Sequence, residues 1–259
     1  MRRTILIGIF LFFLAGGCLD GLNLFTIEDD KTLGAQVDAE IESDSADYPV
    51  LDEDDYASAY DYLNGIVDEI LAVDDVQYDD EFVWQVHIIN DDSVVNAFAT
   101  PGGYLYFYTG LIKYLESEDS FAGVVGHEIA HADQRHVTDN LTKEYGISLL
   151  LDVVLGNRLD LVSGIALNLI DLSFSRDAEA EADEYSVIYL SGTQYACNAA
   201  ADFFEKLLEE EDASSPPEFL STHPSPENRV DDINAKADEL DCDTTPSGND
   251  YAAFQEMLP

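Results

Sequence analysis

A five-residue motif with the pattern H-E-x-x-H sets the tightest limit on the architecture. His127, Glu128 and His131 lie inside an apolar stretch that favours a helix over 118–136. Helical residues four apart share a face about one turn apart, so both imidazoles can reach one metal ion. Glu128 is rotated by about 100° and is placed to take a proton from a water held by that ion. The motif therefore predicts a catalytic zinc helix rather than a surface helix with ordinary histidines.

A catalytic zinc needs a third protein ligand. On a continuous helix His136 would face away from the metal, nine residues after His127, so we exclude it. Glu179 and Asp183 are four apart on a predicted helix and share a face, so one can bind zinc while the other accepts a hydrogen bond from a ligand histidine. Glu181 points the opposite way.

The pattern of apolar residues predicts an α+β fold that is mostly helical with a small β-sheet. Pro101-Gly102-Gly103 indicates a turn between two of the strands. We expect a first helix within 19–50, helices over 52–73, 109–115, 118–136, 146–155, 159–172, 175–190, 196–211 and 229–240, and strands over 82–89, 94–98 and 104–108.

The N-terminus has the pattern of an export signal. Arg2 and Arg3 precede an apolar run over 5–14, too short to span a bilayer, and Leu-Ala-Gly-Gly-Cys18 resembles a lipobox. This predicts a lipid-anchored protein on the extracytoplasmic face of the cell membrane; the alternative is an uncleaved signal anchor. The predicted organisation is a signal peptide over 1–17 ending before Cys18, a tether and lead-in over 18–50, a zinc metallopeptidase domain over 51–240 and a C-terminal tail over 241–259.

The charge is strongly negative. The chain has 54 Asp plus Glu against 11 Lys plus Arg, a formal net charge of −43, and the acids are spread along its whole length. In dilute buffer the many negative side chains repel one another and oppose the compact state. About 1 M salt shortens the Debye length to roughly 3 Å, which largely screens that repulsion. The composition therefore favours a halophile's protein, a haloarchaeon's in particular. It also argues against a nucleic-acid partner, because a phosphate-binding surface needs basic residues.

Two cysteines remain beyond the lipobox, Cys197 and Cys242. Outside the cytoplasm such a pair suggests one disulfide, and two buried free thiols are the alternative. A zinc-ligand role is disfavoured because neither has a C-x-x-C partner.

Several ordered segments carry a family resemblance. They are the segments over 96–104, 126–136, 175–183 and 221–229, with a lead-in over 23–34. Together they resemble the zinc metallopeptidase family that includes the CAAX prenyl protease and the heat-shock protease HtpX, and especially its secreted, single-domain members. The resemblance implies a gluzincin-type domain with one Zn²⁺ per chain, in which Glu179 is the third ligand and Asp183 supports a ligand.

Other residues near these motifs are candidates for function. We expect His223 to reach the zinc-bound water or the substrate carbonyl, or to block the open metal position when the enzyme is idle; a loop histidine fixed by two prolines is the alternative. Arg229 is expected to pair with an acid near the site. His87 lies in a predicted strand, where a structural role is favoured. Asn96, Ala97, Phe98 and Ala99 are predicted to form an exposed strand that pairs with an extended peptide, an ordinary sheet edge being the alternative.

These expectations combine into one function. The sequence predicts a zinc endopeptidase that hydrolyses extended or misfolded envelope polypeptides. The alternative is a zinc-bound chaperone or assembly factor with little or latent proteolysis, against which the intact Glu128 argues.

Overall fold

A computed structural model of the protein describes residues 25–169, 172–210, 218–224 and 228–259. The predicted signal peptide 1–17 and Cys18 lie outside these residues. Within the described part the fold is α+β and mostly helical, which confirms the predicted class. The helices are α1 (Ile27–Ser43), α2 (Ala57–Leu71), α3 (Thr109–Tyr114), α4 (Glu118–Asp133), α5 (His136–Tyr145), α6 (Ile147–Val154), the 3-10 helix η1 (Leu159–Leu161), α7 (Val162–Leu169), α8 (Arg176–Leu190), α9 (Ala200–Glu210), α10 (Phe219–Thr222), α11 (Arg229–Leu240) and α12 (Tyr251–Gln255).

The sheet has strands β1 (Gln85–Ile89), β2 (Ala97–Thr100) and β3 (Tyr104–Tyr108) in the order β1-β3-β2. β1 runs parallel to β3, and β2 runs antiparallel to it. The β2–β3 turn contains Gly102 and Gly103 at φ values of +81° and +91°, which glycine adopts without the steric cost of a side chain. Because β2 is the last strand in the order β1-β3-β2, it is an edge strand among the described strands.

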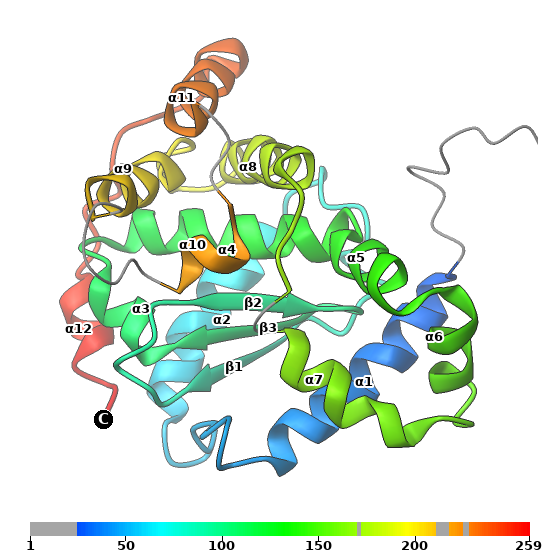
Figure 1. The fold of residues 1–259 in the computed structure, drawn as a ribbon. Helices are drawn as coiled ribbons and strands as arrows, with labels where there is room; N and C mark the ends of the chain where they lie inside the picture. Colours follow the sequence, from blue (N-terminus) through cyan, green and yellow to red (C-terminus); the bar gives the residue numbers. More distant parts are fainter. Residues whose placement is uncertain (1–24, 170–171, 211–217, 225–227) are drawn as a thin grey trace, which may run out of the picture.

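Helix α4 lies at the centre of the fold. Figure 1 shows it running between the sheet and the pair α8 and α9, with α11 beyond that pair and α2 passing behind. Every residue of α4 is buried. Glycines let the neighbours approach, because a Cβ on Gly123 would lie 2.5 Å from the backbone nitrogen of Ala200. This tight packing fixes the helix that carries the H-E-x-x-H motif.

The helix predicted over 118–136 ends three residues early, at Asp133. Arg135 adopts a left-handed conformation with φ of +60°, and a separate helix, α5, begins at His136. The Arg135 side chain explains the break, because its Nε donates to Asp30 Oδ2 at 2.6 Å and its Nη2 donates to the Phe25 carbonyl at 2.6 Å. Asp30 belongs to α1, so a contact distant in sequence ends the helix.

Both ends of the described chain extend beyond the predicted domain 51–240. Helix α1, in the predicted lead-in, buries Leu33, Val37 and Ile41 completely. The predicted tail 241–259 contains α12, whose Tyr251 and Phe254 are buried in the same core. These segments are part of the packed structure because their apolar side chains complete its core.

The two cysteines form a disulfide between Cys197 and Cys242, which joins the start of the α9 region to the end of α11. The pairing agrees with the disulfide reading rather than with free thiols. In the part of the chain that the structure describes, no helix is long and apolar enough to cross a membrane.

Candidate metal centre

Four buried side chains bring potential metal ligands together. His127 and His131 come from α4, Glu179 from α8, and His223 directly follows α10; one ligand atom from each lies within 4.8 Å of the others. The Nε2 atoms of His127 and His131 are 3.1 Å apart, as their spacing on one helix face predicts. Glu179 Oε1 lies 3.4 Å from His131 Nε2 and 3.1 Å from His223 Nδ1. All four side chains are 0% exposed.

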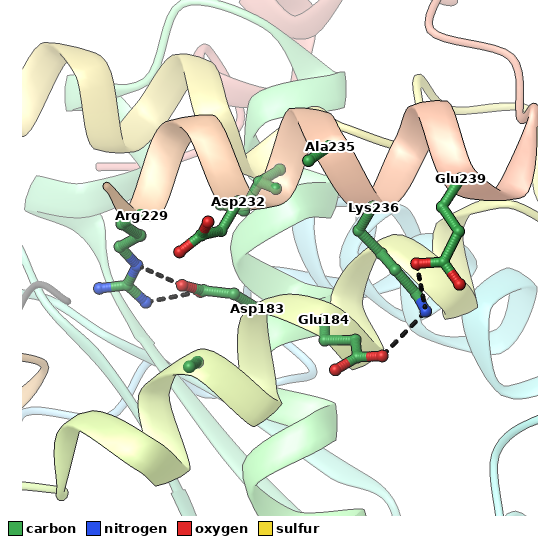
Figure 2. Close-up of a pocket in the computed structure, with 9 residues that line it drawn as sticks. Asp183, Glu184, Arg229, Asp232, Ala235, Lys236 and Glu239 are labelled. Carbon is green, nitrogen blue, oxygen red and sulfur yellow. Dashed lines mark hydrogen bonds and ion pairs between the residues drawn. The ribbon is translucent and has the colours of Figure 1, made fainter. Parts of the chain in front are cut away.

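Asp183 and Arg229 support this cluster from the side of α8 and α11. Asp183 Oδ1 lies 3.0 Å from His127 Nδ1, the ring nitrogen that faces away from the cluster. Arg229 Nη2 donates to Glu179 Oε2 at 3.0 Å and to Asp183 Oδ1 at 2.7 Å. A pocket of about 330 Å³ is lined by residues of α8 and α11. Figure 2 shows the Arg229–Asp183 pair at one end of these lining residues. None of the four clustered residues lines that pocket, so it lies behind the candidate centre.

Glu128 lies one position beyond His127 on α4 and is also 0% exposed. Among the described residues neither of its carboxylate oxygens has a hydrogen-bond partner, and His223 Nε2 lies 3.5 Å from its Oε1. Burial raises the pKa of Glu128 above its ordinary value. A buried carboxyl group without partners is costly, so it points to a reactant or ion that the side chain serves.

The electrostatics of the cluster favour a positive charge within it. Burial alone would lower the pKa of His127, but Asp183 and Glu179 outweigh burial and raise it to about 9. Burial would likewise raise the pKa of Glu179, yet His223 and Arg229 hold it well below its ordinary value. Burial lowers the pKa of His131 well below its ordinary value, which leaves that imidazole neutral. Nitrogen and carboxylate donors around a site that favours positive charge fit a divalent transition metal.

The strand predicted to receive a peptide is buried rather than exposed. Asn96 is 0% exposed, and Ala97, Phe98 and Ala99 on β2 are also buried. The segment around α10 is bonded to it, with the Phe219 amide donating to the Val95 carbonyl at 3.1 Å. The side chains of this strand are therefore covered, although β2 lies at the edge of the sheet, and its pairing with a peptide stays a prediction.

The remaining histidines fall outside the cluster. His136 contacts His131 through its Nδ1 and Glu181 through its Nε2, so it adjoins the site without joining it. Sequence reasoning missed this contact because it assumed one continuous helix over 118–136. His87 on β1 lies 2.8 Å from Asp38 and stacks on Tyr106, as a structural residue would.

The sequence model of peptidase family M48 matches residues 58–237. The chain belongs to this family. The match includes both histidines of α4, Glu179 and His223, and it confirms the predicted metallopeptidase resemblance. Members of the family are metal-dependent peptidases.

Individual relatives agree with the family assignment. The mitochondrial metalloendopeptidase OMA1 of Arabidopsis thaliana is 35% identical over 147 residues, which cover 56% of this chain and 30% of that protein. The β-barrel assembly-enhancing protease of Escherichia coli (strain K12) is 32% identical over 188 residues, or 63% and 36% of the two chains. OMA1 of Saccharomyces cerevisiae is 30% identical over 193 residues, or 69% and 55%. The chain thus spans between about a third and about half of the length of these relatives.

Proposed function

We propose that this protein is a zinc-dependent endopeptidase that hydrolyses extended or misfolded polypeptides of the cell envelope. The observation that carries the proposal is the buried cluster of His127, His131 and Glu179 beside Glu128, a carboxyl group without a hydrogen-bond partner among the described residues. Family membership supports a peptidase, and the residue types support zinc.

His127, His131 and Glu179 would hold one Zn²⁺ through two imidazole nitrogens and a carboxylate. Bound zinc acts as a Lewis acid toward the scissile carbonyl and the attacking water. Asp183 accepts the Nδ1 proton of His127, which leaves the lone pair of Nε2 free for the metal. Arg229 donates hydrogen bonds to Asp183 and Glu179 and so fixes the positions of both carboxylates.

Glu128 is the proposed general base. It takes a proton from the attacking water and then delivers that proton to the leaving amine. Its burial raises the pKa of the carboxyl group, which makes it a better proton acceptor than an exposed glutamate. Because the carboxylate has no hydrogen-bond partner among the described residues, it is free to bond the attacking water.

His223 has two proposed roles that its position supports. Its Nδ1 lies 3.1 Å from Glu179 and its Nε2 lies 3.5 Å from Glu128, so it occupies the side of the cluster where a substrate carbonyl would enter. In the closed state it blocks the open metal position, and with substrate bound it donates to the developing oxyanion.

Substrate binding would need an opening of the site. The clustered ligands are 0% exposed, and the segment with α10 is bonded to Val95, just before the edge strand β2. Displacement of that segment would let an extended peptide approach the main chain of Asn96 to Ala99 and pair with it, which would account for a loose sequence preference. Complete burial also favours, as a second candidate, an assembly factor with latent proteolysis.

The proposed location is the extracytoplasmic face of the cell membrane, with a lipid anchor at Cys18. The apolar run over 5–14 and the small residues before Cys18 support export and lipidation. The partners are polypeptides, and the net charge of −43 opposes binding to nucleic acid.

Cleavage of casein in high salt, with zinc content measured on the same samples, tests the proposal. Wild type is expected to cleave, and Glu128→Gln is expected to keep its zinc and lose activity by at least about 10²-fold, since a general base contributes that much. Equal zinc with no cleavage by either protein would favour the assembly factor.

His223→Ala tests the role of His223 in the same assay. Loss of activity with retained zinc supports a catalytic role for His223, whereas unchanged activity and zinc affinity contradict that role.

A further inference from the structure

We propose that His136 is a positioning residue that fixes the tautomer and orientation of the ligand His131. It does so through two successive hydrogen bonds, from His131 to His136 and from His136 to Glu181. The inference rests on the proposed metal site. It assigns a task to the one histidine next to the cluster that the mechanism does not use.

The two ring nitrogens of His131 face different partners. Its Nε2 points into the cluster, 3.1 Å from His127 Nε2 and 3.4 Å from Glu179 Oε1. Its Nδ1 points out of the cluster and lies 3.1 Å from His136 Nδ1. A metal on Nε2 needs the lone pair of that nitrogen, so the proton of neutral His131 must sit on Nδ1.

This position of the His131 proton determines where the protons lie in the two hydrogen bonds that lead to Glu181. A proton on His131 Nδ1 makes His136 Nδ1 the acceptor, because one nitrogen in the pair must donate and the other accept. The proton of neutral His136 then sits on Nε2, which lies 3.2 Å from Glu181 Oε2. The carboxylate of Glu181 is an acceptor when ionised, so each donor in the chain meets one acceptor.

The two histidine ligands of α4 thus have different outer partners. His127 meets the carboxylate of Asp183 directly at 3.0 Å, whereas His131 meets an imidazole that is itself held by a carboxylate. Outer partners of this kind hold the ring of a ligand and raise its basicity. Without His136, the Nδ1 proton of a buried His131 would lose its acceptor.

The backbone is shaped to bring His136 to this place. The left-handed Arg135 ends α4 and turns the chain back, so His136 lies against His131 with ring centres 5.1 Å apart. Arg135 is held by buried Asp30, which also accepts from Thr138 Oγ1 at 3.0 Å on α5. His136 itself is 8% exposed, so bulk water does not readily replace it as the acceptor.

Three substitutions at one position test the inference. His136→Asn can place an amide oxygen where Nδ1 stands, His136→Gln places its amide near the position of Nε2, and His136→Ala provides neither. Zinc dissociation constants are measured by chelator competition in high salt, with the unfolding midpoint of each metal-free protein as the folding control. Glu181→Gln, which keeps an acceptor oxygen for His136 Nε2, is the matched control.

Wild type and Glu181→Gln are expected to bind zinc alike, and His136→Ala and His136→Gln are expected to bind about 10- to 100-fold more weakly. His136→Asn is expected to regain most of the affinity, and its Co²⁺-substituted form should keep the wild-type visible spectrum. Equal affinity in all three His136 variants overturns the inference, as does an Asn variant no better than Gln. If wild type itself binds no metal, the proposed function fails with it; normal zinc binding in every variant leaves that function intact and removes only the role of His136.

Discussion

Arg229 is 1% exposed, so its guanidinium group lies in the interior of the protein. It neutralises two buried carboxylates, Glu179 and Asp183, and its guanidinium carbon lies 3.4 Å above the ring of Phe204. Removing Arg229 would leave the carboxylates of Glu179 and Asp183 uncompensated in the interior. The free-energy cost of such unpaired buried charge exceeds what the intact ion pairs contribute to stability.

Arg229→Met is therefore expected to destabilise the metal-free protein by about 3–5 kcal/mol. The measurement is urea unfolding in high salt with a chelator present. Arg158→Met is the matched control, because Arg158 pairs with Asp160 at the surface and its loss should leave the unfolding midpoint unchanged. Similar midpoints for Arg229→Met and wild type would remove the charge-neutralising role from Arg229.

Local spacing explains which site residues the sequence could reveal. His127 and His131, and likewise Glu179 and Asp183, are one turn apart on a helix, so helical geometry alone predicts that each pair shares a face. The place of His136 could not be predicted, because it depends on the contact between Arg135 and Asp30 on α1.

At the scale of elements, α4 and α9 owe their close approach to a single missing side chain. A Cβ at Gly123 would meet the backbone of Ala200 at 2.5 Å, a contact that only movement of one helix relieves. Gly65 on α2, by contrast, has no atom within 4 Å of such a Cβ among the described residues.

Gly123→Ala is expected to lower the free energy of unfolding by about 1–3 kcal/mol, the usual cost of overpacking. Gly65→Ala should raise it by about 0.5–1 kcal/mol, because alanine favours the helix and meets no obstacle. Chemical unfolding of both variants in the same buffer makes the comparison. A Gly123→Ala protein as stable as Gly65→Ala would contradict the packing described for α4.

The elements found from the sequence are those with a strong local pattern. The strand over 104–108 and the helix over 229–240 agree with the structure residue for residue. α12 was not predicted, because its burial comes from distant partners: Phe254 stacks on Tyr62 of α2 with ring centres 4.5 Å apart. β1 begins at Gln85 rather than at 82, because Trp84 has φ of +48° and leaves the extended region.

At the scale of the whole molecule, the net charge of −43 opposes the compact state. In the described part, surface cations with acidic partners include Lys31, Lys113 and Lys206, far fewer than the acids around them. We therefore expect dissolved salt to screen much of the repulsion between the acidic side chains.

The melting temperature is expected to rise by on the order of 10 °C or more when NaCl increases from about 0.1 M to above 1 M. Screening of the repulsion would raise the free energy of unfolding by several kcal/mol, which shifts the melting temperature of a domain of this size by that amount. Differential scanning calorimetry measures the change. Sucrose at matched water activity is the control for solute exclusion, which does not screen charge. A melting temperature that does not respond to salt would contradict the halophile interpretation.

The central claim is that one Zn²⁺ is held between α4 and α8. Anomalous X-ray scattering at the zinc edge, from crystals grown in high salt, tests it most directly. The account predicts one peak at about 2.0–2.2 Å from Nε2 of His127, Nε2 of His131 and a carboxylate oxygen of Glu179. A folded protein with no peak at this cluster, or with its zinc at the separate group of Asp38, Glu42 and His87, would contradict it.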